Sequence, residues 1–450
     1  MLTPIMISLL CGTIGYIKPA TGFGLFFLFN TGLGGGFEEI GLIDPKLGPF
    51  QAGNLAYATA IFSLLLRKAS NPNNRIKPSL LLFLLLVFTG LALFSRSMEL
   101  GTIFTTKIIW EIFYCLLWAP LFMALQKMDR VELYLCRRFL IFMSGITALI
   151  AILITMTGSQ YLYDLFATRS EDLMQKDFIQ GRIIVHGLWT FMPLGLWFCL
   201  MELFKEQKGR KGNTFLYGPM AMVVILAIAI NLTRFMLLAL LSGIAFILIA
   251  AFFILPRHIS RKIYKFTGVL IIFLIIVILG SEGIYSGWMG RYQEARLPWW
   301  QQGRIIRNEY VFTRLVNELP LLGNKDYWSE EARISLITGD PHTFLNIWTS
   351  YGLIASLTFA VIMAVVFVSL VKIFILRKRC TGEVIYEWLF LFAFYIQLHW
   401  LMVSGDYLYE VTVFILILFL AEVNRLGSAM KHGNFTGTLR LRDWGMRVNL

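Results

Sequence analysis

Long apolar runs separated by short polar connections extend along almost the whole chain. Backbone polar groups in lipid must pair within their own segment, so runs of this length are predicted to be helices. We expect about 12 transmembrane helices in an all-α integral membrane protein. The predicted helical segments are 1–34 (one long or two short helices), 51–66, 79–95, 103–125, 139–157, 183–203, 215–232, 235–255, 266–280, 343–371, 386–404 and 408–424.

Basic residues cluster in every second connection between the apolar segments. The clusters are Arg67/Lys68/Arg75/Lys77, Lys127/Arg130/Arg137/Arg138, Lys205/Lys208/Arg210/Lys211, Arg257/Arg261/Lys262/Lys265 and Lys372/Arg377/Lys378/Arg379, with more in the C-terminal tail. The intervening connections are acidic, mixed or very short: 35–50, 96–102, 158–182, 232–234, 281–341 and 405–407. The positive-inside rule predicts that the clusters are cytoplasmic and the other connections lie outside. Two spans within 1–34 would also put the N-terminus outside.

The composition narrows the class of protein. Of 450 residues, 57% are hydrophobic and 15% are charged, whereas about a quarter are charged in a typical soluble protein. The net charge of +13 lies in the short clusters that fix topology, which argues against a nucleic-acid partner. The five cysteines avoid the long polar loops, which argues against a disulfide framework or a zinc site. Met1 to Tyr16 is predicted to be a retained membrane helix rather than a cleaved leader.

We expect one polytopic membrane domain over residues 1–450, without internal repeats. Two outer loops stand out by length, at 158–182 and 281–341. Loops of that size in a compact protein usually carry function.

The larger loop contains a predicted amphipathic helix that begins at Gly303. Apolar residues share one face of it, namely Ile305, Phe312, Val316 and Leu319, and arginines gather on the opposite side, namely Arg304, Arg307 and Arg314. Such a helix can lie on the membrane with a row of guanidinium groups exposed. The alternative is a surface helix whose arginines only meet anionic lipid.

Arginines also flank two other outer connections. Arg234 stands between two apolar runs, where topology requires no positive charge, and a membrane arginine is a functional hypothesis by default. Arg182 and His186 open the segment after the first outer loop, and their four-residue spacing puts them on one helical face. Snorkelling of Arg234 to the interface, or interfacial capping by Arg182 and His186, would explain them without a site.

His342 follows Pro341 and precedes an apolar helix on the predicted outer side. Its imidazole could hold a sugar hydroxyl or accept its proton, because its pKa lies near neutrality. His399, in the outer half of an apolar segment, could line the same cavity. A purely structural role is the alternative for both. DxD, HExxH, GxSxG and Walker motifs are missing, so arginines rather than a metal ion are expected to neutralise a leaving diphosphate.

Together these residues resemble the O-antigen ligase and O-antigen polymerase superfamily of bacterial envelope glycosyltransferases. The resemblance covers mainly residues 180–360 and consists of layout plus short motifs. The motifs are Arg182, Thr233-Arg234, Gly303-Arg304, Pro341-His342 through Asn346, and Gly352-Leu353-Ile354.

The resemblance implies a GT-C-like fold and a metal-independent, inverting glycosyltransferase without a cofactor, in lipopolysaccharide or related polysaccharide biosynthesis. Its donor would be a glycan on undecaprenyl diphosphate, and its acceptor lipid A-core or another lipid-linked repeat, at the periplasmic face of the bacterial inner membrane. Arg234 and Arg304, with Arg182 and Arg307, would bind the diphosphate. His342 would orient or deprotonate the incoming hydroxyl. Ligase and polymerase stay open alternatives.

Two other functions compete with this interpretation. A transporter or flippase for an anionic lipid-linked substrate would also use membrane arginines, although such proteins usually show internal repeats. A scaffold protein could use the large loop to bind a partner, but this function would not explain the position of Arg234 between two apolar runs.

Overall fold

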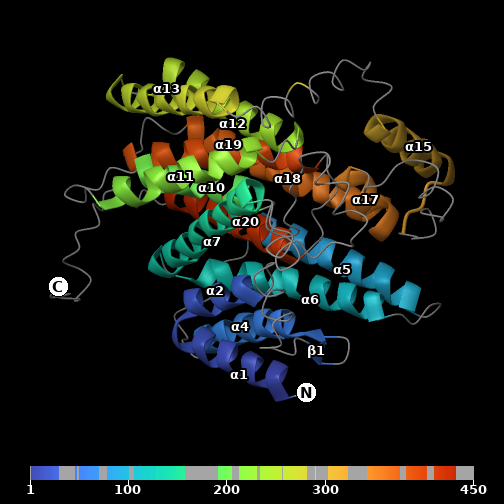
Figure 1. Cartoon of the computed structure of the whole chain (residues 1–450). Coiled ribbons are helices and arrows are strands. Elements are labelled where there is room, and N and C mark those ends of the chain that lie inside the picture. Colours follow the sequence, from blue (N-terminus) through green and yellow to red (C-terminus); the bar gives the residue numbers. More distant parts are fainter. Residues whose placement is uncertain are drawn as a thin grey trace.

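The computed structural model describes residues 2–29, 46–47, 50–69, 79–100, 106–128, 130–157, 191–204, 212–230, 234–255, 257–280, 289, 303–322, 342–375, 382–402 and 410–431. Helices make up nearly all of these residues (Figure 1). They are α1 (Leu2–Ile17), α2 (Pro19–Phe29), α4 (Ala52–Ala69), α5 (Leu80–Leu100), α6 (Thr106–Lys127), α7 (Arg130–Thr157), α10 (Phe191–Phe204), α11 (Gly212–Ile230), α12 (Arg234–Phe253), α13 (Arg257–Gly280), α15 (Gly303–Glu318), α17 (Thr343–Tyr351), α18 (Leu353–Ile375), α19 (Gly382–Met402) and α20 (Glu410–Lys431). Two short strands, β1 (Lys46–Leu47) and β2 (Phe50–Gln51), pair in antiparallel fashion.

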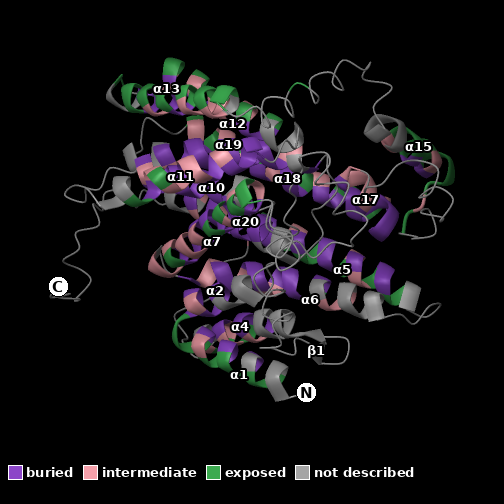
Figure 2. Cartoon of the chain, in the orientation of Figure 1, coloured by how far each residue is buried: buried purple, intermediate pink, exposed green. Residues whose placement is uncertain are grey.

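Within the described ranges, three helices are long and apolar enough to cross a membrane: Leu80–Met98, Val131–Thr157 and Leu353–Ile375. Six shorter apolar helices accompany them. α13 exposes Ile272, Ile276 and Leu279, each by 60% or more, and Figure 2 shows exposed residues along much of this helix. An exposed apolar face of this kind suits contact with lipid. The prediction of a helical protein is confirmed, with the short β1–β2 pair as the exception. The fold is compatible with a membrane protein, while the span count of about 12 stays a prediction.

The N-terminal apolar segment forms two helices that fold back on each other. α1 ends at Ile17 and α2 begins at Pro19, whose ring cannot donate the next helical hydrogen bond. A Cβ atom on Gly22 would lie 2.6 Å from the Cα atom of Gly15, so only glycine allows this approach. Of the two sequence-based alternatives, two short helices is the one that forms.

Most of the remaining helices pack side by side in one bundle. α10 lies against α7 and α11, α12 lies along α19, and α18 packs on α5 and α20. One cluster of buried apolar side chains runs through this bundle, and aromatic stacks such as Phe394 on Phe419, with ring centroids 4.6 Å apart, fill it.

A network of buried charges joins four helices at one end of the bundle. Arg137 of α7 donates hydrogen bonds to Glu202 of α10, at 3.3 Å, and to Glu422 of α20. Arg425 binds Glu422 at 2.9 Å and Glu387 of α19 at 3.1 Å. The prediction that Arg137 belongs to a cytoplasmic loop cluster is wrong in one respect, because α7 begins at Arg130 and Arg137 is 4% exposed. A buried guanidinium needs carboxylate partners, and here it joins helix ends that the charge pattern assigns to one side of the membrane.

The predicted single segment 343–371 is divided at Gly352. α17 ends at Tyr351, Gly352 has a φ of +93°, and α18 begins at Leu353. A positive φ is open to glycine without strain and ends the helical hydrogen-bond pattern. The segment is therefore a short helix followed by a long apolar one.

Candidate functional site

His342 caps the N-terminus of α17. It has φ −50° and ψ 140°, and its Nδ1 accepts a hydrogen bond of 3.3 Å from the backbone N–H of Phe344. An imidazole nitrogen that accepts a hydrogen bond carries no proton, so in the neutral ring the proton lies on Nε2. The ring also stacks on Phe344, with centroids 5.5 Å apart. The geometry therefore presents Nε2–H of His342 as a donor.

The helix α15, in the loop that the sequence predicts to lie outside, contacts the residue that carries this imidazole directly. The backbone N–H of His342 donates a hydrogen bond of 3.0 Å to Oδ1 of Asn308 in α15. Val311 and Leu315, one and two turns further along α15, are buried against Trp348 of α17. Polar and apolar contacts thus fix α15 on α17.

The chain after α15 is held on the junction between α17 and α18. The carbonyl of Pro320 accepts hydrogen bonds from Nε1 of Trp348, at 3.2 Å, and from the backbone N–H of Leu353, at 3.0 Å. A Cβ atom on Gly352 would collide with the carbonyl group of Leu321. Gly352 is therefore needed twice, once for its positive φ and once for the close approach of this segment.

The two helices that begin or end near His342 and His399 contact each other at this end of the molecule. The hydroxyl of Thr343 donates a hydrogen bond of 3.0 Å to the carbonyl of Met402, which ties the start of α17 to the end of α19. His399 lies one turn before Met402 in α19. Burial lowers the pKa of His342, and the charge of nearby His399 lowers it further. Both effects favour the neutral form of His342 near pH 7.

Two arginines of the large loop, Arg304 and Arg307, belong to the same helix as Asn308. Arg304 is one turn before Asn308 and Arg307 directly precedes it, in a helix that forms where the sequence predicts one. The side chains of Arg304 and Arg307 are not among those that the structure describes. The structure therefore brings the N-terminal turns of α15 to His342, and the guanidinium positions stay a prediction.

The other predicted arginines are placed less closely. Arg234 begins α12, which packs along α19, the helix that carries His399. Its side chain lies outside the described residues, as do Arg182, His186, loop 158–182 and most of loop 281–341.

The predicted faces of α15 need one correction. The side chains that bury against α17 are Val311 and Leu315, whereas Phe312 and Val316 are exposed by 51% and 42%. Leu319 is exposed too, and lies beyond the end of the helix with a positive φ. The contact with α17 buries only one edge of the apolar face of α15. The rest of this face is exposed and suits contact with lipid.

Arg314 has a local explanation. Its Nε donates a hydrogen bond of 3.1 Å to Glu318, four residues along the same exposed helix surface. The surface interpretation of Arg314 is favoured, and Arg314 becomes a natural control for Arg304.

Sequence reasoning missed Arg96. It was assigned to the outer connection 96–102, but α5 continues to Leu100 and Arg96 is 1% exposed. Its guanidinium lies over the ring of Tyr351 at the end of α17, 4.8 Å from the centroid, and the preceding Ser95 donates to the carbonyl of Ser350 at 3.2 Å. The argument applied to Arg234, that an arginine at an apolar boundary needs a partner, would also have identified Arg96.

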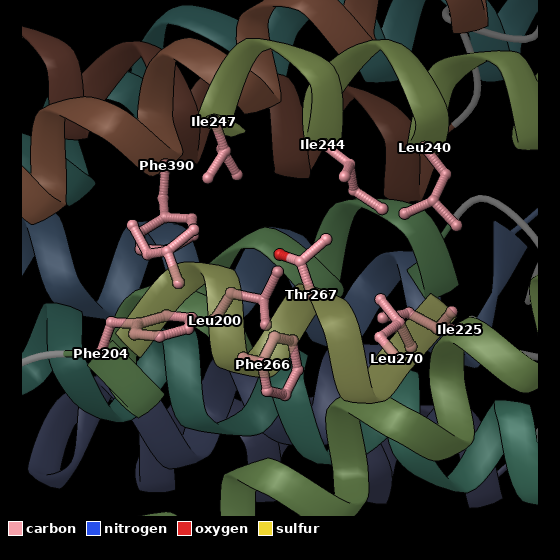
Figure 3. A pocket seen from close by; sticks show the side chains of 11 residues that line it. Leu200, Phe204, Ile225, Leu240, Ile244, Ile247, Phe266, Thr267, Leu270 and Phe390 are labelled. Atoms are coloured by element: carbon pink, nitrogen blue, oxygen red, sulfur yellow. The ribbon is translucent and has the colours of Figure 1, made fainter. Parts of the chain in front are cut away.

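An apolar pocket lies elsewhere in the bundle, among α10, α11, α12, α13 and α19 (Figure 3). Phe204, Phe266 and Phe390 help to line it, and the hydroxyl of Thr267 is the only polar side-chain group among its lining residues. Hydrocarbon of this kind suits a lipid chain and not a phosphate. The His342 region, with polar groups from α15, α17 and α19, is the better candidate for polar chemistry.

No family model, curated protein or solved structure matches the chain. The resemblance to O-antigen ligases and polymerases, and every activity it implies, therefore stays a prediction. The geometry around His342 is the observation from which a function can be argued.

Proposed function

We propose that the chain is a membrane glycosyltransferase of the O-antigen ligase and polymerase type. It transfers a glycan from undecaprenyl diphosphate to a hydroxyl of lipid A-core or of another lipid-linked repeat. In this proposal the bundle has about 12 spans in a GT-C-like arrangement. The reaction takes place at the periplasmic face of the bacterial inner membrane.

One observation carries the proposal: the hydrogen bond between Asn308 and the backbone of His342. It joins the helix that contains Arg304 and Arg307 to an imidazole that presents Nε2–H. A cationic helix end next to a neutral donor suits a lipid that carries a diphosphate and a sugar.

The chemistry needs two tasks, and the proposal gives each to a group. Arg234 and Arg304, with Arg182 and Arg307, bind the diphosphate and stabilise its charge as the anomeric bond breaks, since guanidinium forks match pairs of phosphate oxygens. His342 orients the incoming hydroxyl through Nε2–H, because its Nδ1 already caps α17. The diphosphate is a good leaving group, which lowers the demand on the protein.

Reconstitution in liposomes tests the proposal. The full-length protein is supplied with undecaprenyl-diphosphate-linked glycan and an acceptor on the same face, and both sugar transfer and undecaprenyl diphosphate release are measured. Matched transfer and release are the expected result. Movement of intact donor across the bilayer without release would show a transporter or flippase instead. A topology reporter in the large outer loop checks sidedness, and a cytoplasmic signal there would overturn the periplasmic assignment.

A further inference from the structure

His399 is held in the opposite tautomer from His342. Its Nδ1 lies 2.9 Å from the carbonyl oxygen of Tyr395. A carbonyl oxygen only accepts, so Nδ1 must donate and carries the proton. In the neutral ring Nε2 of His399 then has a free lone pair. The ring packs on Tyr395, with centroids 4.4 Å apart, which fixes its orientation.

The two imidazoles therefore have complementary capacities. His342 offers a proton at Nε2, because its Nδ1 accepts from Phe344, and His399 offers a lone pair at Nε2. For His342 to act as a base at Nε2, a proton would have to move to Nδ1 and the helix cap would break. His399 requires no such rearrangement. The tautomers therefore make Nε2 of His342 a hydrogen-bond donor and Nε2 of His399 an acceptor. The sequence motif alone does not assign these roles.

A contact between α17 and α19 brings both histidines to one end of the bundle. Thr343, next to His342, binds the carbonyl of Met402, which is three residues after His399. Each ring is half-buried, so each is partly open to a ligand. His399 also contributes to the lowered pKa of His342, which agrees with this placement of both residues at one end of the bundle.

We propose that His399 is the group that accepts the proton of the incoming hydroxyl, and that His342 holds the hydroxyl oxygen as a hydrogen-bond donor. This inference rests on the proposed function. The hydroxyl oxygen forms a bond to the anomeric carbon, and the bond from that carbon to the phosphate oxygen breaks with its electron pair left on undecaprenyl diphosphate. The proton passes to Nε2 of His399 and then to water when the products leave.

The test compares variants that separate the two nitrogens of His399. His399→Asn can keep a donor toward Tyr395 and removes the group at Nε2, whereas His399→Gln can place an acceptor there that is not a base. Rates are measured in the liposome assay with undecaprenyl-diphosphate-linked glycan, and thermal unfolding confirms that each variant folds. His258→Asn, at the start of α13, is the matched control.

We expect both His399 variants to lose about 100-fold or more in kcat, the range of general-base catalysis, with KM for the acceptor nearly unchanged. Added imidazole should restore part of the rate of His399→Ala. A wild-type kcat in His399→Gln, or a loss that imidazole does not restore, would overturn the base role while leaving the proposed function intact. If the wild-type protein transfers no sugar, the proposed function fails with it.

Discussion

Oδ1 of Asn308 accepts a hydrogen bond of 3.0 Å from the backbone N–H of His342, 34 residues later in the chain. This contact connects the amphipathic helix α15 with the cap of a second helix, α17. It makes the position of one imidazole depend on a loop that sequence alone would treat as a separate feature.

Asn308→Ala should slow sugar transfer by about tenfold, which corresponds to the loss of one hydrogen bond of about 1.4 kcal/mol. The backbone N–H of His342 would lose its partner, and α15 would lie less firmly on α17. Initial rates in liposomes provide the measurement. Glu309→Gln, at the exposed neighbouring position, should keep the wild-type rate, and equal rates in all three proteins would show that this docking contact is irrelevant to activity.

Gly352→Ala should displace the segment after α15. The new methyl group would collide with Leu321, and the positive φ would be strained. We expect a cysteine introduced at Leu322 to become more reactive toward a membrane-impermeant maleimide, together with a large loss of transfer. Gly268→Ala, where a Cβ atom has nothing within 4 Å, should change neither. Unchanged labelling in Gly352→Ala would contradict the packing described for this junction.

Arg137→Ala should destabilise the bundle by about 3–5 kcal/mol, because it leaves the buried carboxylates of Glu202 and Glu422 without their shared cation. Thermal unfolding in detergent would report the change as a lower Tm. Arg67→Ala removes a more exposed pair with Glu132 and should cost about 1 kcal/mol or less. Equal decreases in Tm for the two variants would mean that the buried network stabilises the protein no more than an exposed ion pair does.

The folded protein should lose stability when the medium becomes acidic enough to protonate His342, because a proton on Nδ1 would break the hydrogen bond that this nitrogen accepts from Phe344. The pKa of His342 is lowered from the ordinary value of 6.5, by burial first and then by the charge of His399. The unfolded chain therefore binds this proton before the folded one does, so the stability that neutral His342 contributes is lost as pH falls below 6.5.

A profile of Tm between about pH 5 and about pH 8 measures this. The loss of stability should begin below pH 6.5 and should be smaller in His399→Asn, because one cause of the lowered pKa of His342 is removed. The same change of Tm with pH in the wild-type protein and in His342→Gln would contradict a neutral, buried imidazole at His342.

Much of the fold follows from the order of residues, and the reasons are local. Apolar runs predict the helices because lipid and core both require them, and the pattern after Gly303 predicts α15. Arg137 shows where such reasoning stops. Its partners Glu202 and Glu422 are 65 and 285 residues away, so a charge that reads as a loop residue becomes a buried one only through tertiary packing.

The site shows the same division. His342 stands out because it precedes an apolar helix on the predicted outer side. Its tautomer depends on the cap at Phe344, and its docking depends on Asn308. Neither contact has a sequence signature, since a single asparagine in a polar loop predicts no particular partner.

Binding of undecaprenyl diphosphate to the purified full-length protein tests the central claim most directly, namely that the arginine-bearing start of α15 and His342 form one site for the lipid diphosphate. Native mass spectrometry would compare the wild-type protein with Arg304→Ala, Arg304→Lys and Arg314→Ala. We expect Arg314→Ala to bind like the wild type, since Arg314 pairs with Glu318. Arg304→Ala should lose binding by about tenfold or more and Arg304→Lys should recover only part of it, because lysine lacks the guanidinium fork. Equal binding by Arg304→Ala and the wild type would contradict the claim.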